Sequence, residues 1–127
     1  MLETKFYVCS HCGNIVKKFH DSGIPVFCCG EAMKELVPKT ADAAGEKHVP
    51  LIEVNGEDVK VTVGSTLHPM VESHYIVWIY LETSNGGQFH SFKPGDEPIA
   101  NFKLAKDEKV ISAYEYCNIH GLWIAKL

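Results

Sequence analysis

Two groups of residues in this sequence have the types and the spacing of metal ligands. In the first group, Cys9 and Cys12 form a C-x2-C pair, and the adjacent pair Cys28-Cys29 follows after fifteen intervening residues. Two pairs of sulfurs at such a spacing can close a tetrahedral site, which suits zinc or a single iron ion. The adjacent pair is unusual, because two neighbouring residues that bind one metal are expected to distort the tetrahedron.

Three interpretations of this cysteine group remain open from the spacing alone. The group can hold a structural zinc, form a redox-active disulfide between Cys9 and Cys12, or hold a rubredoxin-like iron. Gly13 and Gly30 directly follow the two pairs, where permissive backbone lets amide groups point at the sulfurs. We predict that His11, inside the first pair, is exposed to solvent, because four sulfurs already complete a site.

The fifth cysteine, Cys117, stands apart in the segment "YCNIHG", where His120 follows three residues later. One sulfur and one imidazole leave a metal site short of ligands, so we expect other histidines to complete it. The candidates at strand edges or in loops beside Pro or Gly are His48, His68 and His74. His90 falls inside a predicted strand, and His20 falls in the cysteine-rich segment. Taken singly, each histidine is more often a surface or core residue than a ligand.

The elements that must position these ligands divide the chain into three segments. Residues 1–37 are rich in Cys and Gly, and so short a segment rarely folds without a metal, disulfides or a partner chain. Residues 38–47 are small and polar and are predicted to be a linker. Residues 48–127 show β patterns, and we predict about seven short strands in an antiparallel sandwich. No stretch has a helical period, so the expected fold class is all-β.

Turns and strands can be located within the third segment. Asn55-Gly56 separates two apolar runs and predicts a hairpin with positive φ at both positions. The run His74–Glu82 is apolar on both faces, as in a central strand, and Asn85–Gly87 predicts the next turn. Further strands are predicted at Gln88–Phe92, Pro98–Leu104, Lys109–Cys117 and Gly121–Leu127.

Composition and charge narrow the possible partners and the compartment. The 127 residues are 46% hydrophobic and carry a net charge of −4, with no basic cluster, so nucleic acid is an unexpected partner. No apolar run has the length of a membrane span, and the N-terminus lacks the layout of a signal peptide. We therefore expect a cytoplasmic protein, in which five cysteines favour metal binding over structural disulfides.

Five separated motifs together resemble one known family. The run C-x2-C-x15-C-C is followed by "EKHVP", "GSTLHPM…SHYIVWIYL", "KPGD" and "YCNIHGLW", in an order and spacing similar to desulfoferrodoxin, the two-iron superoxide reductase. The resemblance covers essentially the whole chain and implies a desulforedoxin-like domain followed by an immunoglobulin-like sandwich. It implies that a distorted iron centre is bound by Cys9, Cys12, Cys28 and Cys29, and the spacing of these cysteines keeps zinc as an alternative. It implies a second iron with an axial Cys117 and four equatorial histidines, namely His48, His68, His74 and His120.

The resemblance also implies an activity and partners. Superoxide would be reduced to hydrogen peroxide at the second iron, with electrons from a small donor such as rubredoxin, by a protein that forms homodimers. Glu46 and Lys47 match the catalytic pair of the family's "EKH" motif. A thiolate opposite an open position donates electron density to the metal, and Lys47 can attract an anionic substrate to a protein of net negative charge. Three alternatives are an iron protein that only relays electrons, a zinc-stabilised binding module and a superoxide dismutase.

Overall fold

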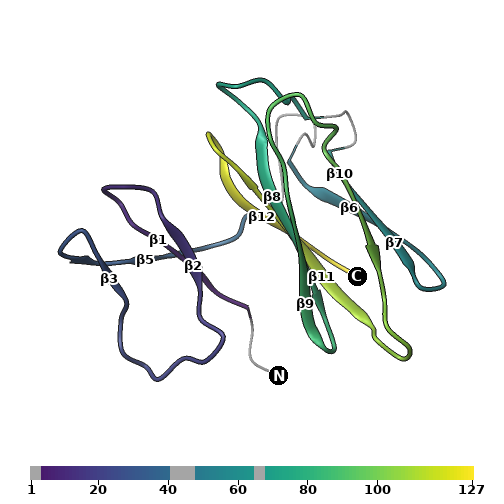
Figure 1. The fold of residues 1–127 in the computed structure, drawn as a ribbon, viewed down its shortest axis with the longest axis horizontal. Coiled ribbons are helices and arrows are strands. Elements are labelled where there is room, and N and C mark those ends of the chain that lie inside the picture. Colours follow the sequence, from purple (N-terminus) through teal and green to yellow (C-terminus); the bar gives the residue numbers. More distant parts are fainter. Residues whose placement is uncertain (1–3, 41–47, 65–67) are drawn as a thin grey trace. The chain divides into compact units, whose positions relative to one another are not determined.

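The computed structural model describes residues 4–40, 48–64 and 68–127 of the chain. The chain divides into two compact units, residues 1–37 and 38–127, and strands are the only regular elements among the described residues (Figure 1). The expected all-β fold is therefore confirmed. Each unit is described separately below.

The first unit contains two small antiparallel sheets and very little core. The three-stranded sheet has the order β2-β1-β5, and its strands are β1 (Phe6–Val8), β2 (Ile15–Lys17) and β5 (Lys34–Leu36). The other sheet is a hairpin of β3 (Phe27–Cys28) and β4 (Glu31–Ala32). Phe6 and Met33 are buried, but Phe19 is 95% exposed. So small an apolar core contributes little to folding, and another source of stability is needed.

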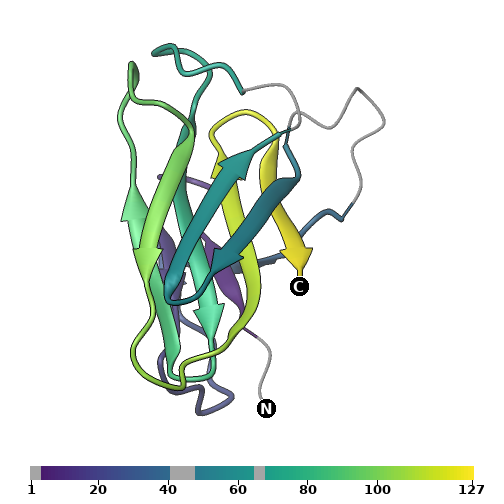
Figure 2. The ribbon, with the colours of Figure 1, turned by 90° about the vertical axis from the view of Figure 1, so that its right-hand side faces the viewer.

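The second unit is a sandwich of two antiparallel sheets (Figure 2). The first sheet has the order β10-β7-β6, and the second has the order β12-β11-β8-β9. The strands are β6 (Pro50–Asn55), β7 (Asp58–Val63), β8 (Ile76–Thr83), β9 (Gly86–Ser91), β10 (Ile99–Lys103), β11 (Val110–Cys117) and β12 (Gly121–Lys126). Alternate residues of β7 (Val59, Val61 and Val63) pack in the core against apolar residues of β8 and β11. The predicted seven-stranded sandwich is thus what the chain forms.

The first predicted hairpin is present, but its turn lies one residue later than the sequence suggests. Asn55 pairs with Asp58 and is the last residue of β6, so the two turn residues are Gly56 and Glu57. Gly56 has φ 63°, whereas neither Asn55 nor Glu57 has a positive φ. Val59 must face the core, and this requirement sets the register between β6 and β7. The register overrides the local preference of Asn55-Gly56 for the two turn positions.

The predicted turn at Asn85–Gly87 is also displaced. Thr83 pairs with Gly86, so Ser84 and Asn85 form the turn and both glycines belong to β9. Gly87 lies beneath the ring of Tyr80, whose hydroxyl donates a hydrogen bond to the Gly86 carbonyl at 3.3 Å. The glycine therefore provides space for an aromatic side chain instead of forming the turn.

Replacing Gly87 with alanine is expected to destabilise the sandwich. The new Cβ would overlap the ring and hydroxyl of Tyr80 and would lie 2.8 Å from the Leu81 carbonyl oxygen. Overpacking of this kind costs about 1–3 kcal/mol of the free energy of unfolding. Chemical denaturation should measure the loss, with Ser91→Ala as a control at an exposed position of the same strand. Equal stability of the two variants would contradict the close packing inferred here.

The segment predicted to be a linker is partly attached to the sandwich. Lys39 lies beside Trp123 of β12 in a parallel bridge, with a hydrogen bond from the Lys39 amide to the Leu122 carbonyl at 2.9 Å. Residues 41–47, which include Glu46 and Lys47 of the predicted catalytic pair, lie outside the described residues.

Candidate metal centres

The four cysteines of the first unit lie together as one of two groups of potential metal ligands found among the described residues. Cys9 and Cys12 lie on either side of a tight turn, which is closed by a hydrogen bond from the Gly13 amide to the Cys9 carbonyl at 3.0 Å. The Cys12 amide points at the Cys9 sulfur at 3.4 Å. Gly13 has φ 80°, the conformation that directs the chain away from the sulfurs after the turn.

The adjacent pair reaches the same point because of an uncommon backbone conformation. Cys28 pairs with Glu31, so Cys29 and Gly30 form a two-residue turn. Their φ values are 53° and 76°, as required in the tight hairpin turn with positive φ at both central positions. Neighbouring residues of an extended strand point to opposite faces, whereas this turn brings the sulfurs of Cys28 and Cys29 into one group. The left-handed backbone at Cys29 is thus what lets two adjacent cysteines join one ligand group.

The spacing and ionisation of these sulfurs suit a bound cation. All four are free thiols, and the sulfurs of Cys12 and Cys28 are 3.6 Å apart. Sulfurs bound tetrahedrally at about 2.3 Å from a metal are about 3.8 Å apart. The amides of Cys12 and His11 lower the pKa of the Cys9 thiol to about 6, whereas hydrogen bonds with Cys12 and Cys9 raise that of Cys29 to about 12. A positive charge between the four sulfurs would favour their ionised forms.

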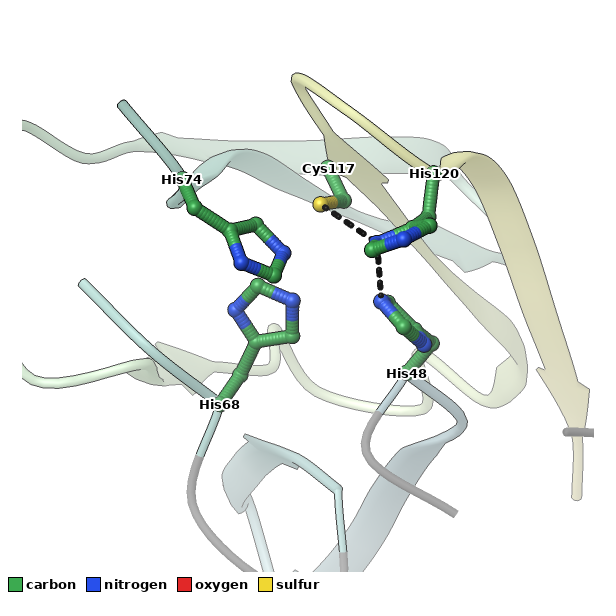
Figure 3. Close-up of side chains that lie close together, drawn as sticks. All are labelled: His48, His68, His74, Cys117 and His120. Atoms are coloured by element: carbon green, nitrogen blue, oxygen red, sulfur yellow. Dashed lines mark hydrogen bonds between the residues drawn. The ribbon is translucent and has the colours of Figure 1, made fainter. Parts of the chain in front are cut away.

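The second group lies at one end of the sandwich and comes from three connections. His48 immediately precedes β6, and His68 and His74 lie in the connection between β7 and β8. Cys117 is the last residue of β11, and His120 lies in the turn before β12. Figure 3 shows the five side chains pointing toward one another, and their potential ligand atoms all lie within 4.8 Å of one another.

The four imidazole rings lie at the corners of a near-square. Ring centroids are 4.8 Å apart for His48 and His68, 4.6 Å for His68 and His74, 5.0 Å for His74 and His120, and 4.5 Å for His120 and His48. The diagonal from His48 to His74 is 6.4 Å. Nε2 of His48 and Nδ1 of His120 are 2.9 Å apart. Two nitrogens at right angles around one metal, each at about 2.1 Å, would be about 3.0 Å apart, so the arrangement fits a metal.

The ring of His68 is held in the orientation of a metal ligand. Its Nδ1 donates to the Pro69 carbonyl at 2.7 Å, which leaves Nε2 with the lone pair. Nε2 is buried and has no hydrogen-bond partner within the described parts of the chain. Burial lowers the pKa of His68 to about 4, and the other three histidines act in the same direction. His68 is therefore neutral at pH 7, as a metal ligand must be.

Cys117 adds a fully buried sulfur to the near-square of four histidines. Burial raises the pKa of the thiol, while backbone hydrogen bonds from His120 and Ile119 act in the opposite direction. A thiol in this environment stays protonated until a metal cation displaces the proton. His120, by contrast, is exposed, so the group extends from the core to the surface of the sandwich.

Sequence reasoning missed one residue that connects the segments of this group. Asn118 accepts a hydrogen bond from the Tyr75 amide at 3.0 Å and donates one to the Ser73 carbonyl at 3.2 Å. It therefore ties the turn of Cys117 and His120 to the chain on both sides of His74. The position of Asn118 inside "YCNIHG" was the signal for this role in the sequence, because Asn side chains often hydrogen-bond to the backbone of loops.

The chain has two separate groups of metal ligands. One is a group of four sulfurs in a small unit, and the other is a group of four imidazoles and one thiol in a β-sandwich. They define a protein with two distinct mononuclear metal centres. Known proteins agree with this class. The family model described as desulfoferrodoxin matches residues 40–126. The chain belongs to the desulfoferrodoxin family, and its two groups are consistent with the two iron centres of that family.

Individual relatives support the assignment over nearly the full length. The chain is 50% identical to desulfoferrodoxin of Nitratidesulfovibrio vulgaris over 123 residues, which cover 96% of this chain and 95% of the relative. It is 42% identical to superoxide reductase of Pyrococcus horikoshii, with 72% and 93% covered. The crystal structure of superoxide reductase from Treponema pallidum matches with a TM-score of 0.85 at 36% identity, covering 98% of both chains.

The described residues contain no helix with the length and hydropathy needed to cross a membrane.

Proposed function

We propose that this chain is a superoxide reductase, which transfers one electron and two protons to superoxide and releases hydrogen peroxide. The observation that carries the proposal is the near-square of four histidines with a buried cysteine, on the sandwich of a desulfoferrodoxin. His48, His68, His74, His120 and Cys117 would hold the catalytic iron, and Cys9, Cys12, Cys28 and Cys29 would hold the second iron.

The protein residues set the conditions for this reaction. When bound, the iron supplies the one-electron redox step and a cationic binding point for the substrate. With iron bound, four neutral imidazole ligands would leave the centre positively charged, which would favour binding of an anion. The thiolate of Cys117 would donate electron density and make the metal a stronger reductant. Because Cys117 is buried whereas His120 is exposed, substrate and protons would enter from the solvent side.

Two further residues and two partners complete the proposal. Glu46 and Lys47 directly precede His48, and by resemblance to the family they would act beside the iron. Lys47 would attract superoxide and help to supply protons through water, and Glu46 would occupy the open position in the resting oxidised state. A rubredoxin-like donor would supply the electron, and the protein would be a homodimer.

Replacing Lys47 with alanine is expected to slow the association of superoxide by about 10-fold at low ionic strength, while both irons stay bound. The reason is that Lys47 offsets the repulsion between an anion and a protein of net charge −4. Pulse radiolysis should give the second-order rate constant, and added salt should reduce the difference from the native protein. Lys103→Ala removes the same charge from an exposed position of β10 and serves as the control. An unchanged rate for Lys47→Ala at low salt would refute the steering role.

The stoichiometry of the reaction tests the proposed function directly. Under anaerobic conditions, a pre-reduced reductase forms one hydrogen peroxide for each superoxide and releases no oxygen. A dismutase forms one peroxide for every two superoxide ions and releases oxygen. A protein that only relays electrons has no open coordination position, so azide would leave its spectrum unchanged. Evolution of oxygen at half stoichiometry would overturn the proposal, and iron analysis in parallel would exclude or establish zinc at both centres.

A further inference from the structure

The main chain of Lys39 is hydrogen-bonded to β12. This strand follows the five-residue centre, which consists of His48, His68, His74, Cys117 and His120. Its amide donates to the Leu122 carbonyl and its carbonyl accepts from the Ile124 amide, each at 2.9 Å. These two bonds place Lys39 directly beside Trp123. The position of the Lys39 side chain relative to β12 is therefore set by the backbone.

The side chains of Lys39 and Trp123 converge on one carbonyl group, that of His120. Nζ of Lys39 donates to the His120 carbonyl at 2.9 Å, and Nε1 of Trp123 donates to it at 3.2 Å. Together they can engage both lone pairs of this oxygen. The Lys39 ammonium also lies 5.1 Å from the centroid of the Trp123 ring, within the range of a cation–π contact.

The same tryptophan contacts a second member of the centre. The rings of Trp123 and His48 are stacked, with centroids 4.8 Å apart and an angle of 12° between their planes. Trp123 is only 6% exposed, so its packing restricts movement of the indole. One side chain thus contacts two histidines that are 72 residues apart in the sequence.

We propose that Lys39 and Trp123 are positioning residues of the five-residue centre, which hold the main chain of His120 and the ring plane of His48. We propose further that the Lys39 ammonium favours the ferrous state of a bound iron. A nearby cation opposes an increase in the charge of the metal, and groups around the ligands commonly orient them and tune the metal. The inference rests on the proposed function for the identity of the metal.

The experiment compares Lys39→Met, Lys39→Arg and the control Lys103→Met in the full-length, iron-loaded protein. Lys103 is exposed and pairs with Asp58, next to the Gly56–Glu57 turn, where β7 begins. The Lys103 control therefore removes the same charge from the same unit. The first measurement is the rate at which a ferrous chelator removes iron from the five-residue centre. The second is the midpoint potential of that centre. Neither uses superoxide, so failure of this inference is distinct from failure of the proposed function.

We expect Lys39→Met to lose iron about 10-fold faster or more and to have a lower midpoint potential than the native protein. Lys39→Arg retains a cation and a donor and should restore both values, and Lys103→Met should change neither. Trp123→Phe keeps a ring against His48 but lacks the Nε1 donor, so faster iron loss with an unchanged potential would separate positioning from charge. An unchanged release rate or potential in Lys39→Met overturns the proposal, as does a failure of Lys39→Arg to restore them.

Discussion

Cys117→Ser is expected to abolish superoxide reduction while both units stay folded. Cys117 is the only cysteine in residues 38–127, so it is the only possible source of a thiolate-to-iron band from the sandwich. Loss of a direct ligand should exceed the roughly 10–100-fold effect typical of groups that only support a ligand. The visible spectrum should therefore lose the band of the five-residue centre and keep that of the four-cysteine centre.

A control is needed because serine places a hydroxyl group in a fully buried position. Ala113→Ser introduces the same group on the same face of β11, at another fully buried position. This variant should be modestly less stable but should keep the thiolate band and the activity. If Cys117→Ser retained the band of the sandwich and reduced superoxide at the native rate, the assigned role of Cys117 would be wrong.

The double variant Cys12→Ser/Cys28→Ser is expected to unfold the first unit and to leave the sandwich intact. In that unit the buried apolar side chains are few, and Ile24, Phe27 and Val37 are more than half exposed. A structural metal in such a small domain supplies about 10–16 kcal/mol of apparent binding free energy, which is in effect folding free energy. Without it, the entropy of ordering some thirty residues is not offset.

Hydrogen exchange resolved by residue should measure this loss. Amides of β1, β2 and β5 should exchange at nearly the rate of an unfolded chain, while those of β8 and β11 keep their protection. Cys117→Ser is the matched control, because it alters the other centre and should leave β1, β2 and β5 protected. Slow exchange in the first unit of the double variant would show that the metal is not what holds it together.

Much of the fold followed from the sequence because strand periodicity is a local property. The two apolar runs around Asn55-Gly56 indicated β6 and β7, and the apolar run of β8 marked it as a central strand. The two turns were each displaced by one or two residues. The register of the core fixes the position of Gly56, and the Tyr80 ring requires the space at Gly87, so that Gly86 and Gly87 belong to β9. Those constraints come from residues in other strands, so the local turn preferences could not reveal them.

The candidate site was less accessible to local reasoning. The spacing of the four cysteines indicated that they form one group. It did not reveal that the positive φ of Cys29 lets two adjacent residues share a metal. Their positions in loops or at strand edges made His48, His68 and His74 candidates, but only the resemblance joined them to Cys117 and His120 in one site. Lys39 and Trp123 gave no signal, because they act through a carbonyl group and a ring face. The roles of Glu46 and Lys47 stay predictions, because both lie outside the described residues.

The separation of the ligands along the chain has a consequence for the order in which the two centres acquire metal during synthesis. Cys12 and Cys28 are 16 residues apart, so the first centre closes a short loop and can bind iron as soon as the N-terminal segment is available. His48 and His120 are 72 residues apart and meet only after both sheets of the sandwich have formed. The centre in the sandwich is therefore among the last parts of the molecule to be completed.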